Sequence, residues 1–112
     1  MSKFEEKVQL YKQSSDELGL GLSESLIRSV TKGLGPSIYQ EDSSKVSGSD
    51  KDELTRVKTN FLVKKLGLKD GPELDAAVAE AVEKMGQSNR NKYRALVYAL
   101  LVKKFKKESI YS

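Results

Sequence analysis

The sequence contains no cysteine and no histidine. Without cysteine the chain has no disulfide framework, no zinc site of the cysteine type and no thiol nucleophile. Without histidine it lacks the commonest metal ligand and the usual general base near neutral pH. We therefore expect no catalytic residues, no metal site and no cofactor, and we predict that the protein is not an enzyme.

Long apolar runs are also missing. The longest contains eight residues, from Ala95 to Val102, whereas a helix needs about 20 apolar residues to cross a bilayer. The first residues, from Met1 to Glu6, lack the apolar segment that a secretory signal carries. We expect no membrane association and a cytoplasmic location, which the absence of cysteine also suits.

The length of 112 residues, with 38% hydrophobic and 32% charged residues, predicts a single globular domain over residues 1–112. The net charge is +4, but it is unevenly distributed. The segment from Lys84 to Lys107 holds eight basic and no acidic residues, so the rest of the chain is mildly acidic. This asymmetry fits either a polyanion partner or a basic helix that packs against acidic ones.

Apolar residues recur at helical spacing along most of the chain, and strand alternation is almost absent. The pattern predicts an all-α fold, a compact bundle of four to five longer helices. The expected helices run from Lys3 to Leu18, from Ser23 to the glycines at 33 and 35, from Asp50 to Gly67, from Asp70 to Gly86, and from Ser88 or Asn89 to before Ser109. The last helix is apolar all round in its middle, which predicts a central position. A peripheral place for residues 3–18 stays open, and residues 43–49 are expected to form a loop.

Three segments carry a resemblance to a known family: residues 57–68, 74–85 and 88–105. The most specific part is Asn-Arg-Asn-Lys at 89–92, followed by an aromatic-rich helix that ends in Lys104-Phe105. Over residues 50–107 the chain resembles a small bacterial family of all-helical proteins catalogued as a domain of unknown function. Members often carry cysteine near the loop before the third helix, where this chain has Ser-Gly-Ser. The resemblance implies an all-helical single domain, with no activity and no catalytic residues.

The sharpest candidate site is a basic cluster expected at the start of the last helix. Its residues are Asn89, Arg90, Asn91, Lys92 and Arg94. Basic side chains there oppose the helix dipole, whereas an anion would be held by both the dipole and the side chains. Phosphate, a nucleic-acid backbone or a partner carboxylate would each fit. The alternative is neutralisation inside the fold, with an acid at position 50, 52, 53 or 83 as the partner and the asparagines as caps.

A second basic group follows the apolar run. Its members are Lys103, Lys104, Lys106 and Lys107. At the end of a helix these lysines complement the dipole, which accounts for most of them. The alternative is a polyanion-binding edge on which Phe105 and Tyr111 act as stacking rings.

These observations predict a small non-enzymatic binding domain that acts on a protein partner or through self-association. The alternative is nucleic-acid binding through the basic C-terminal helix. An undetectable affinity for generic DNA or RNA at low salt would exclude that alternative, because its affinity must come mainly from phosphate contacts.

Overall fold

The computed structural model describes residues 2–40, 43–86, 89 and 91–111. Within these residues it contains five α-helices and no strand, which confirms the all-α prediction. The α-helices are α1 (Lys3–Leu18), α2 (Glu24–Leu34), α3 (Lys51–Arg56), α4 (Pro72–Met85) and α5 (Arg94–Lys104). Three further helical segments complete the described chain, namely two 3₁₀-helices at Gly35–Tyr39 and Glu108–Tyr111 and a π-helix at Val57–Val63.

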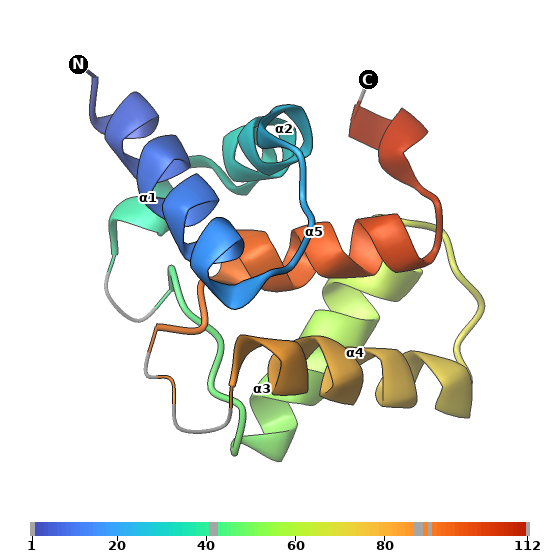
Figure 1. Cartoon of the computed structure of the whole chain (residues 1–112). Coiled ribbons are helices and arrows are strands. Elements are labelled where there is room, and N and C mark those ends of the chain that lie inside the picture. The colour runs from blue at the N-terminus through green and yellow to red at the C-terminus, as the bar shows by residue number, and fades with distance from the viewer. Residues whose placement is uncertain (1, 41–42, 87–88, 90, 112) are drawn as a thin grey trace.

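Helix α5 lies at the centre of the fold, as its all-round apolar sequence predicts. Figure 1 shows α1 and α2 on one side of it and α3 and α4 on the other. The buried residues of α5 are Ala95, Leu96, Val97, Ala99, Leu100, Leu101 and Val102. They belong to one apolar core that also includes residues of α1, α2, α4 and the π-helix.

The first three helices each begin directly after a residue whose side chain caps the helix. The Ser2 hydroxyl accepts a hydrogen bond from the Glu5 N–H at 3.2 Å, and the Ser23 hydroxyl accepts one from the Leu26 N–H at 3.1 Å. The Asp50 carboxylate accepts two backbone N–H groups at the start of α3. Each cap satisfies donors that have no partner within the helix, which fixes where the helix starts.

The third predicted helix is only partly α-helical. After Arg56 the chain continues as the π-helix Val57–Val63, in which the Lys64 N–H donates to the Thr59 carbonyl at 3.2 Å. The wider turn matches the spacing of the core-facing residues of this segment, which are Val57, Phe61, Leu62 and Leu66. Tertiary packing therefore overrides the α-helical geometry that sequence periodicity alone predicts.

The last helix begins later than predicted, at Arg94 instead of after residue 88 or 89. Residues 44–46 and 92–94 pair through their backbones, with the Val46 N–H donating to the Lys92 carbonyl and the Arg94 N–H to the Ser44 carbonyl, both at 2.8 Å. This pairing holds residues 92–93 extended and keeps them out of the helix. Residues 43–49, predicted as a loop, are thereby fixed to the core.

The last helix also ends earlier than predicted, at Lys104. The Lys106 N–H donates to the Lys103 carbonyl at 3.2 Å, and the Lys107 N–H donates to the Val102 carbonyl at 2.9 Å. This pair of bonds is the Schellman arrangement of a helix C-terminus. Lys106 takes the left-handed position, with φ of 56°.

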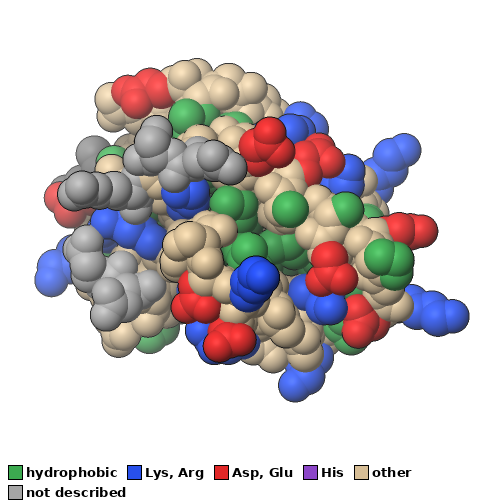
Figure 2. All heavy atoms as spheres, turned by 90° about the horizontal axis from the view of Figure 1, so that it is seen from below, with side chains coloured by type: hydrophobic (Ala, Val, Ile, Leu, Met, Phe, Trp, Pro, Cys, Tyr) green, Lys and Arg blue, Asp and Glu red, His purple; other side chains and the backbone are tan. Residues whose placement is uncertain are grey.

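Two surface properties complete the fold. On the face that Figure 2 shows, acidic and basic side chains are interspersed around small apolar areas. Among the described residues, no helix has the length and apolar content to traverse a bilayer.

Candidate functional site

The structure separates the residues of the predicted anion site. Asn91 and Lys92 precede α5, and Arg94 is its first residue. Asn89 lies near the end of α4, where its side-chain amide donates to the Met85 carbonyl at 2.8 Å. Arg90 lies outside the described residues. The predicted cluster thus spans a connection and a helix start, not one continuous helix N-terminus.

Arg94 joins three segments of the chain through its guanidinium group. It forms an ion pair with Glu53 of α3, and its Nε donates to the Ser43 carbonyl at 2.8 Å. A second nitrogen donates to the Lys45 carbonyl at 3.3 Å, and a third donates to the Tyr98 hydroxyl at 3.1 Å. The Arg94 side chain is only 17% exposed and that of Glu53 only 15%. Of the four acids considered as internal partners, Glu53 is the one that Arg94 contacts.

The neighbouring polar residues also bond within the fold. Lys92 is 7% exposed, and its ammonium donates to the Asn89 carbonyl at 2.6 Å. The Asn89 side-chain oxygen accepts from the Asn91 N–H at 2.9 Å. These bonds link Asn89, Asn91 and Lys92 to one another. Binding of an external anion by this segment stays a prediction.

The electrostatics of Glu53 reflect two opposing effects. Burial raises its pKa, but the hydrogen bonds and charges of Arg94 and Arg56 outweigh burial, and the net pKa is lowered. Burial likewise lowers the pKa of Arg94, while Tyr98 and Glu53 raise it and prevail. The ion pair therefore stays charged at neutral pH.

We expect the fold to lose stability in acid partly through Glu53. A carboxyl group with a lowered pKa in the folded state stabilises the fold above its unfolded pKa, which is about 4.3 for glutamate. That contribution disappears as the pH falls through the lower, folded-state pKa. Urea unfolding between about pH 7 and about pH 3 should show a smaller loss of stability for Glu53→Gln than for the wild type. Equal losses in the two proteins would contradict this assignment.

Aromatic packing supports the same region. The rings of Phe61 and Tyr98 stack with centroids 3.8 Å apart and planes 15° from parallel. Phe61 belongs to the π-helix and Tyr98 to α5, so the stack ties the irregular helix to the central one. Arg94 lies 5.7 Å from the centre of the Tyr98 ring. The ring, the guanidinium and Glu53 together form a structural junction.

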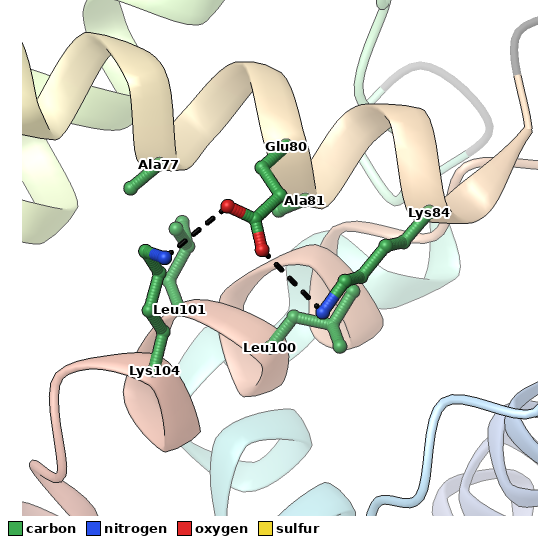
Figure 3. A pocket seen from close by; sticks show the side chains of 7 residues that line it. All are labelled: Ala77, Glu80, Ala81, Lys84, Leu100, Leu101 and Lys104. Carbon is green, nitrogen blue, oxygen red and sulfur yellow. Dashed lines mark hydrogen bonds and ion pairs between the residues drawn. The ribbon is translucent and has the colours of Figure 1, made fainter.

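A shallow hollow lies between α4 and α5 (Figure 3). Its apolar floor consists of Ala77, Ala81, Leu100 and Leu101. Glu80 lies above this floor between two ammonium groups, with Lys104 at 3.2 Å and Lys84 at 3.5 Å. The hydrogen bond from Lys104, followed by the charges of both lysines, lowers the pKa of Glu80. The two ammonium groups and the single carboxylate leave one positive charge in excess at this hollow.

Lysines without acidic partners gather at the end of the fold where α5 stops. We define the C-terminal basic surface as Lys64, Lys65, Lys106 and Lys107. Figure 1 shows the end of α5, the segment that follows it and the turn after the π-helix at the same end of the molecule. The turn after the π-helix contacts the C-terminal segment directly, because the Lys65 ammonium lies 5.4 Å from the centre of the Tyr111 ring. Tyr111 in turn packs beside Gly33 of α2.

The described acidic groups do not pair with the lysines of this surface. Among the described residues, no acidic side chain forms an ion pair with any of its four lysines. Two lysines of α5 have partners, since Lys103 donates to the Gly21 carbonyl at 2.9 Å and Lys104 pairs with Glu80. Lys106 and Lys107 follow the last residue of α5.

The sequence predicts only two of the four lysines of this surface. It singles out Lys106 and Lys107 as part of a possible polyanion-binding edge, but it misses Lys64 and Lys65. The adjacent lysines before Gly67 are a visible signal. Only the packing of the C-terminal segment against the turn that follows the π-helix shows that these residues share a surface with the chain end.

Fold and site together define a small all-helical domain with a structural ion-pair junction and a C-terminal basic surface. The profile of one protein family, described as "Protein of unknown function (DUF2853)", matches residues 9–109. The chain belongs to this family, which confirms the resemblance found over residues 50–107 and extends it into α1. Among curated proteins, no sequence matches the chain significantly.

Proposed function

We propose that this chain is a non-enzymatic binding domain whose partner is a protein with an acidic segment. The observation that carries the proposal is the C-terminal basic surface, whose four lysines form no ion pair with any acidic group among the described residues. Complementary charge across an interface speeds encounter and discriminates between partners. The non-enzymatic part of the proposal rests on the composition of the sequence, which offers neither histidine nor cysteine.

A second observation supports the location of the surface. Lys64 and Lys65 directly follow the π-helix Val57–Val63. Segments of π-helix are rare and occur frequently at functional sites. Here the segment delivers two adjacent lysines to the end of the fold that also presents Lys106 and Lys107.

Nucleic acid is the rival partner for a basic surface. Proteins that bind single strands present aromatic rings on which bases stack. The two rings at this end, Phe105 and Tyr111, are partly buried and pack against the core. Burial raises the pKa of Tyr111 to about 12, and the neighbouring Tyr98 adds to the shift. The arrangement therefore favours an acidic polypeptide, and nucleic-acid binding becomes an outcome of the test.

The test is a pull-down from native cell extract, with and without nuclease, using three forms of the protein. These are the wild type, the surface variant Lys64→Glu/Lys107→Glu, and the control variant Lys3→Glu/Lys51→Glu. Both variants change the net charge equally, and the control residues are the exposed first residues of α1 and α3. We expect a protein that survives nuclease treatment, is displaced by oligoglutamate, and is captured about ten-fold less by the surface variant.

Two results would overturn the proposal. Loss of capture after nuclease treatment would identify nucleic acid as the partner. Equal capture by the surface and control variants would show that the C-terminal basic surface is not used. Circular dichroism of both variants verifies that neither change unfolds the chain.

A further inference from the structure

Lys106 has a backbone conformation that lysine rarely adopts. Its φ of 56° is positive, and every other described residue with positive φ is a glycine. For residues with a side chain the left-handed region costs about 1–2 kcal/mol. Lys106 occupies the position of the Schellman arrangement where glycine is the usual residue. Glycine at this position would therefore give a more stable fold than lysine.

The surroundings of Lys106 point to a use for its side chain. The residue is exposed and belongs to the C-terminal basic surface. None of the described acidic groups forms an ion pair with its ammonium, so the backbone hydrogen bonds of the Schellman arrangement, and no ion pair within the described residues, hold this conformation. Residues held in unfavourable backbone regions cluster at binding and catalytic sites, where the geometry serves the contact.

We propose that Lys106 donates its ammonium to a carboxylate of the acidic partner, and that lysine is retained here for that contact. The inference rests on the proposed function, because it assigns part of the binding to the acidic partner to one residue, Lys106. A substitution that relieves the backbone strain at Lys106 should therefore raise the stability of the fold and lower the affinity for the partner. A merely structural lysine would show no such link between stability and affinity.

Three variants separate the charge from the strain. Lys106→Gly removes both, Lys106→Ala removes the charge and keeps the strain, and Lys106→Arg keeps both. The probe is a fluorescently labelled oligoglutamate peptide, followed by anisotropy, and stability is followed by thermal unfolding. The exposed Lys51→Ala is the control for loss of one positive charge elsewhere.

We expect Lys106→Gly to raise the midpoint of thermal unfolding by about 4–8 °C and to weaken binding about five-fold. Lys106→Ala should weaken binding equally without raising the midpoint. Lys106→Arg and Lys51→Ala should bind like the wild type.

The outcomes that would overturn the inference differ from those that overturn the proposed function. Unchanged affinity in Lys106→Gly and Lys106→Ala would remove the role of Lys106 while the wild type still binds. Equal midpoints for the glycine and alanine variants would show that the backbone is not strained. A wild type that neither binds oligoglutamate nor captures a protein would overturn the proposed function itself.

Discussion

Replacing Arg94 by methionine should lower the free energy of unfolding by about 3–5 kcal/mol. Methionine fills a similar volume but removes every donor of the guanidinium. Glu53 then keeps a largely buried carboxylate without its partner in α5, and the carbonyls of Ser43 and Lys45 lose their donors. Breaking a buried ion pair from one side costs more than the pair contributes, because the remaining charge stays desolvated. Chemical denaturation at neutral pH measures this loss.

Arg56→Met is the matched control for Arg94→Met. Arg56 pairs with the same carboxylate at 3.0 Å, but its side chain is 59% exposed. Exposed ion pairs contribute about 0–1 kcal/mol, so the control should lose no more than that. A loss in Arg94→Met as small as that in Arg56→Met would contradict a structural role for Arg94 and would favour an external anion as its partner.

Adding a methyl group at Gly48 should destabilise the fold by about 1–3 kcal/mol. A Cβ atom at this position would lie 2.8 Å from a methyl carbon of Val82 and 3.2 Å from the side chain of Lys92. Val82 is a β-branched residue in the last turn of α4, where its side-chain rotamer is strongly restricted. The loop or α4 must therefore move. Thermal or urea unfolding of Gly48→Ala measures the loss.

The neighbouring Ser47→Ala serves as the control for Gly48→Ala, because Ser47 is exposed and its replacement should change stability by less than about 0.5 kcal/mol. A double variant tests the cause directly. Val82→Ala removes the clashing methyl group, so its loss and that of Gly48→Ala should sum to more than the loss in the double variant. Strictly additive losses would show that the two residues do not meet.

The sequence predicts the helices and the central place of α5 because their signals are local. The serine caps of α1 and α2 and the apolar residues of α5 act within a few positions of each other. The late start of α5 depends instead on backbone pairing between residues 44–46 and 92–94. The π-helix likewise depends on packing between Phe61 and Tyr98. No local pattern encodes either contact.

The same distinction between local signals and tertiary contacts applies to the candidate site. Sequence reasoning finds Arg94 and four acids that would neutralise it, but only the structure selects Glu53, which lies 41 positions earlier in the chain. It also finds Lys106 as one lysine among several. The left-handed backbone of that residue and the contact between Lys65 and Tyr111 arise from the way α5 ends and the chain folds back toward α2, which spacing alone does not reveal.

We propose that Lys92 and Arg94 serve the fold, whereas the C-terminal basic surface serves binding. A titration of isotope-labelled protein with oligoglutamate, followed residue by residue by NMR, tests both halves together. The account predicts amide shifts concentrated at residues 64–65 and 106–111. Shifts concentrated at residues 91–94, with the C-terminal basic surface unchanged, would contradict it.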